Sequence, residues 1–529
     1  MTDIREQEMQ QEINELKSEN AYLKQQVSLL KNHLYGRKTE KQSVVVPPEQ
    51  MSLFNEAEVE ARKSEPELTL VVKEYKRKKK KVGHRKELLE KLPHTKVVLE
   101  PTEAEKICPA CGSTMSYLGE EFIRSEIHYI PARIEVIDYY SQSYECRKCR
   151  NEETPVILKP ELPKPVIPHS IASPSAVAHI MMQKYGYAMP LYRQETEWQR
   201  IGLPLTRATM ANWIILAAQE WLYPLIHRLH ERLLQEMVIH ADETPVQVHN
   251  EKGKKNTSKS YMWVYTTGPY RENPAIRLFT YCPSRSIDWP EAFLKGYTGF
   301  LMTDDYSGYN FIPADRHCLC FVHARRKFTD AKPTDEKDWT GTLVEEAVRK
   351  MGNLFHMDNM YASLSADERK EKRNPQSPEN SENAEPPHSD NEADILRNLF
   401  AWAKQNQDRV IPKSAISKAL NYLVSNETGL TTYLKDGHCA LSNNIAENAI
   451  RPFTVGRKNW LFINSPKGAA ASAAVYSIIE TCKANQINPE EYLQLLFEKA
   501  PNDPQFTQPE ILDTYLPWNL ILKETNPSE

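Results

Sequence analysis

Four apolar segments with the pattern of β-strands follow one another between residues 236 and 310, and their order limits the fold more than any other feature. The first three are EMVIHADETPVQV (236–248), KSYMWVYTTG (259–268) and AIRLFTYCPSR (275–285). The fourth, TGFLMTDDYSGYN (298–310), follows SIDWPEAFLKGY, which has the pattern of a short helix. Short strands in close succession favour an antiparallel meander. The sequence therefore predicts an α/β domain that begins with three antiparallel strands.

Acidic residues stand where two of these apolar runs end. The first run ends at Asp242, and the fourth ends at Asp304 and Asp305. A meander, a helix and a further strand, with acids after the first and fourth strands, is the element order of a ribonuclease-H-like fold, which brings those two positions together. A third acid, Glu447, lies in LSNNIAENAIRPFTVGRKNWLF (441–462), where polar residues recur every four positions along one helical face. We interpret this segment as a helix packed on the same sheet.

Three carboxylates can hold two divalent cations about 3.5–4 Å apart, which clamp the attacking and leaving oxygens of a phosphodiester. We therefore interpret Asp242, Asp304 and Glu447 as ligands of two Mg²⁺ ions, with Mn²⁺ as the alternative metal. Taken singly, the three residues also fit a strand-end turn, a helix cap and a solvated helix position. The cations and the aromatic ring that would hold DNA beside these acids are Arg451, Arg457, Lys458, Trp460, Arg325, Arg326 and Lys327. We interpret His323, in CFVHARRKF, as a structural residue.

Four of the nine cysteines form two Cys-x-x-Cys pairs, Cys108 with Cys111 and Cys146 with Cys149. Each such turn delivers two thiolates to one side of a tetrahedral zinc ion. Because the segment between the pairs is rich in β-forming residues, the spacing predicts a zinc ribbon with a structural metal. We expect the other cysteines to be buried thiols of a reducing compartment, namely Cys282, Cys318, Cys320, Cys439 and Cys482.

The amino-terminal segment repeats apolar residues at alternating intervals of four and three. The repeat gives a and d positions of a heptad, which include Ile13, Leu16, Asn20, Leu23, Val27 and Leu30. β-Branched residues at a with leucine at d favour two parallel strands, and a single Asn at a fixes their register. We therefore predict a homodimeric coiled coil, with a helix packed on its own chain as the alternative.

A basic tract, KRKKKKVGHRK (76–86), contains Lys78, Lys79 and Lys80 and would neutralise several phosphates along DNA. A solvated linker is the alternative interpretation. The net charge of the whole chain is only −4, so any affinity for DNA must be local. The sequence contains neither a secretory signal core nor the roughly 18 consecutive apolar residues of a membrane span. We expect a cytoplasmic protein that associates with DNA in the nucleoid and has no membrane partner.

Three other segments indicate how the chain is organised. The proline-rich segment at 154–174 favours an extended linker. The residues that follow read as successive helices, with a turn at Gly202 and an N-cap at Thr206, which fits either a helix-turn-helix or ordinary helical packing. Residues 367–394 have the polar composition of a disordered segment. Because the residues on both sides of it have helical patterns, we predict an all-helical insertion.

In their order along the chain, these motifs resemble the transposases of the insertion sequence 66 (IS66) family. The resemblance covers nearly the whole chain and adds LYGRKTEK (34–41) after the heptads and YLPWNLIL near the end. Asp305 stands where a small residue is usual, Phe321 where tryptophan is usual, and Tyr35 where phenylalanine is usual. Asp305 therefore competes with Asp304 as a metal ligand, and we favour Asp304.

The resemblance implies a DDE-type DNA transposase whose triad is Asp242, Asp304 and Glu447. Such an enzyme recognises the terminal inverted repeats of its element, cleaves the 3′ ends and joins them to double-stranded target DNA. The resemblance also implies accessory proteins encoded by the same element. Two alternatives remain: a noncatalytic zinc-ribbon DNA-binding regulator, and a nuclease of the same fold that only cleaves.

The predicted architecture is a multidomain α/β protein. Its parts are a leucine-zipper coiled coil (4–36), a basic connector (37–100), a zinc ribbon (101–153), a proline-rich linker (154–168), a helical region (169–236), a ribonuclease-H-like catalytic domain (237–480) with a helical insertion at about 330–440 that is disordered over 367–394, and a C-terminal helical element with a tail (481–529).

Overall fold

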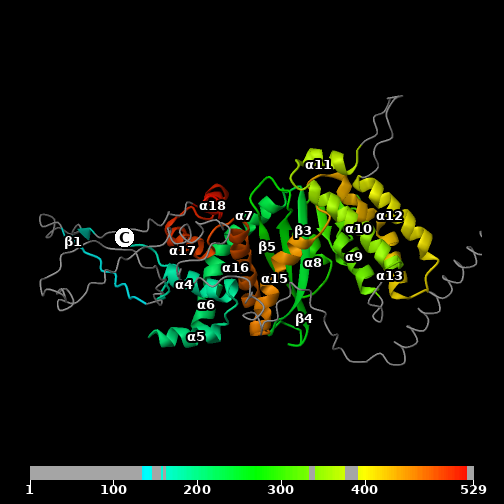
Figure 1. Ribbon diagram of the computed structural model, residues 1–529. Helices are drawn as coiled ribbons and strands as arrows, with labels where there is room; N and C mark the ends of the chain where they lie inside the picture. Colours follow the sequence, from blue (N-terminus) through cyan, green and yellow to red (C-terminus); the bar gives the residue numbers. More distant parts are fainter. Residues whose placement is uncertain (1–133, 146–156, 159–161, 333–339, 376–390, 521–529) are drawn as a thin grey trace, which may run out of the picture. The chain divides into compact units, whose positions relative to one another are not determined.

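A computed structural model describes residues 134–145, 157–158, 162–332, 340–375 and 391–520 (Figure 1). The predicted coiled coil, the basic tract and all four cysteines of the predicted zinc ribbon lie outside these residues. Within the described ranges, every helix is too short or too polar to cross a membrane.

A five-stranded mixed sheet contains all four predicted strands, in the spatial order third, second, first and fourth. The strands are β3 (Val238–Gln247), β4 (Lys259–Thr267), β5 (Arg277–Cys282), β6 (Phe300–Thr303) and β7 (His317–Leu319). Their order is β5-β4-β3-β6-β7, in which β3, β4 and β5 are antiparallel neighbours, whereas β6 and β7 run parallel to β3. The meander is confirmed, as is the short helix α8 (Asp288–Phe293) between β5 and β6.

One hydrophobic core contains residues of the sheet, of helices that precede the sheet in the sequence and of helices that follow it. These helices are α4 (Pro174–Met181), η1 (Met182–Gly186), α5 (Leu191–Arg200), α6 (Arg207–Ala217), η2 (Ala218–Leu222), α7 (Tyr223–Leu233), α15 (Asn444–Trp460), α16 (Pro466–Ala484), α17 (Pro489–Lys499), η5 (Ala500–Asn502) and α18 (Pro509–Tyr515). Figure 1 shows α15 and α16 beside the sheet, where α15 packs on β3 and α16 on β5. Thr206 caps α6 as predicted, because its side chain accepts the Thr209 N–H.

A second hydrophobic core lies where β6 and β7 meet the predicted insertion. Its helices are α9 (Phe321–Asp330), α10 (Leu343–Met360), α12 (Glu392–Gln407), α13 (Ala415–Ser425), α14 (Glu427–Thr431) and η4 (Thr432–Lys435). Helix α11 (Ala366–Arg373) contacts α12 and η4, and η3 (Ser307–Tyr309) follows β6. Successive residues of β3 enter different cores, Val238 this one and Ile239 the first, because side chains of a strand alternate between its faces. Among the described residues between 340 and 435, all regular structure is helical, as predicted.

The prediction of disorder over 367–394 is wrong at both ends. Helix α11 continues to Arg373 and begins with a capping box, in which Ser365 and Glu368 bond to each other's backbone. Helix α12 begins at Glu392. The composition misled because two of the charged side chains here are buried: Arg369 is 3% exposed and Arg373 is 0% exposed. Charge therefore contributes to packing in this segment instead of preventing it.

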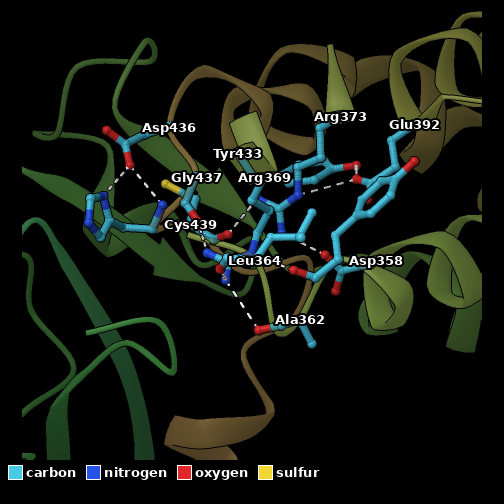
Figure 2. Close-up of polar contacts among 12 residues, drawn as sticks. Asp358, Ala362, Leu364, Arg369, Arg373, Glu392, Tyr433, Asp436, Gly437 and Cys439 are labelled. Carbon is cyan, nitrogen blue, oxygen red and sulfur yellow. Dashed lines mark hydrogen bonds and ion pairs between the residues drawn. The ribbon is translucent and has the colours of Figure 1, made fainter. Parts of the chain in front are cut away.

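Figure 2 shows the polar contacts of these two arginines, which together with Asp358, Glu392 and Tyr433 form what we call the arginine network. Arg373 Nη2 donates to Asp358 Oδ1 over 2.6 Å, and its Nε lies 3.6 Å from Glu392 Oε2. Tyr433 donates its hydroxyl proton to the same Glu392 oxygen over 2.7 Å. The network joins α10, α11, α12 and η4 through groups of opposite charge.

The arginine network also holds the segment that leads into α15. Arg369 Nη1 donates to the carbonyl of Gly437 over 2.6 Å, and Arg373 Nη1 donates to the carbonyl of Cys439 over 2.8 Å. At Gly437 the backbone approaches α11 so closely that a Cβ atom would lie 1.7 Å from the Ala366 carbonyl oxygen. Any side chain at this position would therefore separate the segment from the helix.

Two predicted domain boundaries also differ from the structure. The proline-rich linker is paired and packed in part: β2 (Ile157–Leu158) pairs antiparallel with β1 (Tyr144–Glu145), and Val166 and Ile167 enter the first core. Trp221 Nε1 fixes this entry by donating to the Val166 carbonyl over 2.9 Å. Proline favours an extended backbone, but it does not prevent apolar neighbours from packing. At the other end, α16 continues without a break across residue 480.

Candidate functional site

The sheet register places two of the predicted acids at equivalent positions on neighbouring strands. In the parallel pair of β3 with β6, His240 is opposite Met302, and this is the last pair of the ladder. Asp242 follows His240 by two residues, and Asp304 follows Met302 by two residues. Both carboxylates therefore lie just past the carboxyl end of the parallel ladder. The expectation that the first strand ends at Asp242 is wrong, because β3 stays paired with β4 as far as Gln247.

Asp304 and Asp305 face different partners. Asp304 Oδ1 accepts the Tyr306 N–H over 3.0 Å, which turns the chain immediately after β6. Asp305 is exposed, and its Oδ2 accepts a hydrogen bond from Asn426 Nδ2, near α14, over 3.1 Å. Burial is the main cause that raises the pKa of Asp242, and the charge of Asp304 adds to this effect. Asp304 is therefore the one of the pair that belongs electrostatically with Asp242.

Helix α15 brings Glu447 to the same place through a buried asparagine at its start. Asn443, which is 1% exposed, shares its side-chain oxygen with His240 Nδ1 over 3.0 Å and donates from Nδ2 to the Ala241 carbonyl over 2.8 Å. It is thus bonded to the two residues that precede Asp242. Because Glu447 is one helical turn after Asn443, it lies on the same side of α15. We call Asp242, Asp304 and Glu447 the carboxylate cluster.

The start of α9 connects the segments that carry Asp304 and Glu447. The N–H of Cys320 donates to the carbonyl of Thr303, the residue before Asp304, over 3.0 Å. The N–H of Phe321 donates to the Leu441 carbonyl over 3.1 Å, and the N–H of Asn443 donates to Cys320 Sγ over 3.1 Å. A continuous set of hydrogen bonds therefore fixes the ends of β6, α9 and α15 relative to one another.

Burial and repulsion among carboxylates raise the pKa of Asp242 to about 8. Burial is the largest cause, followed by the charge of Glu243 and then by those of Glu447 and Asp304. Glu243 itself has a cation, because Arg285 Nε donates to its Oε1 over 2.7 Å, and Tyr309 donates to its Oε2 over 3.2 Å. In contrast, Asp242 Oδ1 accepts the Glu243 N–H over 2.9 Å and faces other acids. The cluster concentrates negative charge that a cation would relieve.

A cavity of about 520 Å³ opens beside these acids and carries several cations. Its lining includes Asp304, Asp305, Arg285, His323, Arg326 and Lys327. Arg326 Nη2 lies 4.0 Å from Glu447 Oε2, and His323 Nε2 lies 3.4 Å from Glu447 Oε1. Arg325 instead turns toward Phe355, and Lys327 Nζ lies 4.3 Å from the centroid of the Tyr422 ring. Two of the three predicted cations of α9 therefore line this cavity.

The predicted DNA-binding residues of α15 occupy different surroundings. Arg457 is half-buried and donates to Thr244 Oγ1 over 3.2 Å, and burial lowers its pKa. Arg451 and Lys458 are exposed. Trp460 is half-buried in the first core, where Lys184 Nζ lies 4.2 Å from the centroid of its ring. Lysine therefore already covers one face of the ring on which a base was expected to stack.

The carboxylate cluster fits divalent cations. Oxygen ligands from carboxylates are those that Mg²⁺ prefers. Glu447 Oε1 is buried, and it is one of the polar atoms of the described residues without a hydrogen-bond partner. Among those residues, Cys320, His323 and Glu447 also place possible ligand atoms within 4.8 Å of one another. The five cysteines that the structure describes are free and buried, as predicted.

The sequence does not reveal the roles of four residues of this site. The sequence shows only that Asn443 is four residues before Glu447, whereas in the structure its side chain bonds to β3. The pairing of Glu243 with Arg285 links residues 42 positions apart, so no local pattern reveals it. His323 was interpreted as structural, yet it lies beside Glu447. The motif CFVHARRKF could have indicated this, because Arg325, Arg326 and Lys327 of the same motif are predicted to lie at the site.

Sequence profiles of known families match most of the chain. The "Transposase IS66 family" profile matches residues 169–471, the range that contains the whole carboxylate cluster. The "zinc-finger binding domain of transposase IS66" matches residues 105–150, which include all four paired cysteines and support zinc binding. The "Transposase C of IS166 homeodomain" matches residues 22–97, a leucine-zipper-like region, and the "IS66 C-terminal element" matches residues 477–518.

Relatives in Sinorhizobium fredii (strain NBRC 101917 / NGR234) have similar lengths. The chain is 25% identical over 535 residues to the uncharacterized protein y4jD, with 98% of each chain covered. It is 26% identical over 440 residues to the uncharacterized protein y4hP, with 80% of this chain and 74% of that protein covered. Because one profile spans more than half of the chain and the others extend the match at both ends, the chain belongs to the IS66 family of transposases.

Proposed function

We propose that this protein catalyses DNA transposition with a ribonuclease-H-like domain. It binds the terminal inverted repeats of its element, cleaves the DNA and joins the 3′ ends to target DNA by phosphoryl transfer that depends on Mg²⁺. Asp242, Asp304 and Glu447 are the catalytic residues and the ligands of two Mg²⁺ ions. The strand order β5-β4-β3-β6-β7 supports the fold assignment, since it pairs the first strand of a meander with a parallel fourth strand.

One observation carries the proposal. The parallel register gives Asp242 and Asp304 equivalent positions on β3 and β6, and Asn443 bonds α15 to β3 directly before Asp242. Three carboxylates from two strands and one helix thus come together, although 204 residues lie between Asp242 and Glu447 in the sequence. Convergence of acids whose charges raise the pKa of Asp242, in addition to its burial, supports a site for a charged ligand.

Each part of the site has a role in this chemistry. The three carboxylates would hold divalent cations, which would supply activation of the attacking oxygen and stabilisation of the leaving oxygen. The sheet and α15 hold the three carboxylates in fixed positions, which avoids reorganisation during the reaction. Arg326 and Lys327, which line the cavity, bind the phosphates that flank the scissile bond, and exposed Lys458 extends this contact along the DNA.

The other modules hold DNA and the second subunit. Cys108, Cys111, Cys146 and Cys149 bind a structural zinc ion. The leucine-zipper-like region forms a homodimer, so that each end of the element has its own active site, and Lys78, Lys79 and Lys80 bind the DNA backbone. The protein acts in the cytoplasm on the DNA of the nucleoid, together with accessory proteins of the same element.

Cleavage and strand joining on DNA that carries the element's ends test the proposal. Asp242→Asn, Asp304→Asn and Glu447→Gln are expected to lower both activities at least about a thousandfold, the scale for losing a member of a catalytic unit. Asp305→Asn is the matched control and is expected to stay active. Circular dichroism and DNA binding confirm that each variant folds.

Other outcomes would overturn the proposal in distinct ways. DNA binding by the wild type without cleavage, in the presence of Mg²⁺ and the accessory proteins, would indicate a noncatalytic regulator. Cleavage without joining would indicate a nuclease. Loss of activity in Asp305→Asn but not in Asp304→Asn would exchange these two residues in the triad.

A further inference from the structure

We propose that His323 is a metal ligand: its Nε2 and the Glu447 carboxylate together bind a divalent transition-metal ion such as Mn²⁺. The inference rests on the proposed function in that Glu447 is taken as a metal ligand. It adds a nitrogen ligand to a site for which the sequence indicates only oxygen ligands.

The contact between these two residues has the spacing of two ligands of one ion. His323 Nε2 and Glu447 Oε1 lie 3.4 Å apart, and Glu447 Oε1 makes no hydrogen bond among the described residues. Adjacent ligands of an octahedral ion, each about 2.1 Å from the metal, are about 3 Å apart. The two atoms therefore need to move little to share one ion.

Hydrogen bonds between the starts of α9 and α15 fix the two helices that carry these side chains. His323 is on the first turn of α9 and its side chain is 24% exposed, while Glu447 is on the first turn of α15 with a side chain 30% exposed. The hydrogen bonds of Cys320, Phe321 and Asn443 connect the starts of these two helices. The pair therefore lies on a rigid junction, with His323 lining the cavity, and such rigidity is the requirement for a metal site with preset geometry.

The neighbouring groups leave one carboxylate oxygen for the metal. Arg326 Nη2 approaches the other oxygen, Glu447 Oε2, to 4.0 Å. Cys320 Sγ lies within 4.8 Å of the ligand atoms of both residues but accepts the Asn443 N–H, so it supports the junction between the helices. His323 Nδ1 is buried and also has no hydrogen-bond partner among the described residues.

The ligand set determines which ion binds. Carboxylates and water suit Mg²⁺ and Mn²⁺, whereas imidazole suits transition metals and binds Mg²⁺ weakly. A site with one imidazole and one or more carboxylates therefore favours Mn²⁺ over Mg²⁺ more strongly than a site of carboxylates alone. Removing the imidazole should reduce the affinity for Mn²⁺ and leave the affinity for Mg²⁺ nearly unchanged.

Electron paramagnetic resonance of Mn²⁺ bound to the full-length, zinc-loaded protein without DNA tests this inference. In the wild type, electron spin echo modulation from a directly bound ¹⁴N is expected, because the predicted zinc ribbon has sulfur ligands and contributes no imidazole. His323→Asn should abolish this modulation and weaken Mn²⁺ binding about tenfold, while Mg²⁺ affinity, measured by displacement of Mn²⁺, changes less than about twofold. His323→Gln is a second variant in case the first fails to fold.

A histidine elsewhere provides the matched control. His356 is exposed on α10, so His356→Asn should keep both the nitrogen modulation and the wild-type affinities. Wild-type Mn²⁺ without nitrogen modulation would overturn the inference, as would equal losses of Mn²⁺ and Mg²⁺ affinity in His323→Asn. Since these readouts need no DNA and no turnover, failure of the transposition assay would leave them interpretable, and their failure would leave the carboxylate assignments standing.

Discussion

The arginine network and the carboxylate cluster both contain charged side chains that the fold removes wholly or partly from water, but they differ in how those charges are matched. In the arginine network, Arg373 and Glu392 are both 0% exposed and 3.6 Å apart, and Asp358 and Tyr433 complete the contacts. In the carboxylate cluster, the groups around Asp242 are acids, and their charges add to burial in raising its pKa to about 8.

This difference separates structure from function. A buried cation with buried anions around it is stable only while both signs are present, so the network serves as a connection among helices. Like charges held together reduce stability, and a fold that keeps them is expected to use them for a ligand of opposite charge. Removing one charge should therefore have opposite effects on stability in the two regions.

Arg373→Met tests the arginine network and should have the largest effect on stability. The substitution keeps much of the aliphatic volume but leaves Glu392 and Asp358 without their cation, and breaking a buried pair in this way costs about 3–5 kcal/mol. We expect the free energy of unfolding to fall by that amount in denaturant titrations. Hydrogen exchange should rise first in α11 and in the segment at 436–439 that the network holds.

Lys372→Met is the matched control for that experiment, because Lys372 is the exposed neighbour of Arg373 on α11. Surface substitutions of this kind change stability by less than about 0.5 kcal/mol. Equal losses in the two variants would mean that the charges of the network are not energetically coupled, and the comparison between the two regions would then fail.

Asp242→Asn should have the opposite sign, and its effect should depend on pH. The folded protein has a pKa of about 8 for Asp242, above the ordinary value of 3.8, so it binds this proton more tightly than the unfolded chain does. The wild type therefore loses stability as the pH rises from about 4 to about 8. At pH 9 the wild type carries the unfavourable charge and the variant does not, so we expect the variant to be more stable. Because solvent reaches the half-buried carboxylate and weakens the repulsion, the expected gain is only about 2 kcal/mol.

Unfolding in denaturant at pH 5 and pH 9, with a chelator present, measures this effect. The difference between variant and wild type should be small at pH 5 and should appear at pH 9. Saturating Mg²⁺ should reverse it, because the ion stabilises only the protein that retains its carboxylate ligand. A variant that is less stable than the wild type at both values would show that Asp242 is matched by a partner.

The sequence predicts the strands and helices of this site better than the contacts between them. The apolar runs that end near Asp242 and Asp304 indicate which strands carry acids, because side-chain alternation and chain order are local properties. That both acids lie two residues past the same pair, His240 with Met302, is a property of register. Register depends on packing among strands far apart in sequence, so the pattern could not supply it.

Charge composition alone does not distinguish the two regions either. The segment from Asp367 to Arg373 resembles disordered sequence because its burial partners, such as Glu392 and Cys439, follow it at a distance in the chain. His323 resembles a structural residue for the same reason, since Glu447 is 124 positions later. In each case the chemistry of the side chain was visible, but its partner was set by the fold.

Asp513→Asn gives the smallest expected effect and calibrates the other two, because Asp513 is an acid near the surface that has its cations. Arg228 Nε and Arg232 Nη2 each lie 2.7 Å from its carboxylate, and the hydrogen bond from Arg228 is the main cause that lowers its pKa to about 2.

The lowered pKa gives stability that is present above about pH 4 and is lost as the pH falls toward 2. The side chain is 23% exposed, so we expect the variant to lose about 1 kcal/mol at pH 7 and progressively less below pH 4. Denaturant unfolding between pH 3 and pH 7 measures this loss. The opposite result would be that Asp513→Asn, like Asp242→Asn, becomes more stable relative to the wild type as the pH rises. Burial of the acid, and not the sign of the neighbouring charges, would then control the stability effect at both positions.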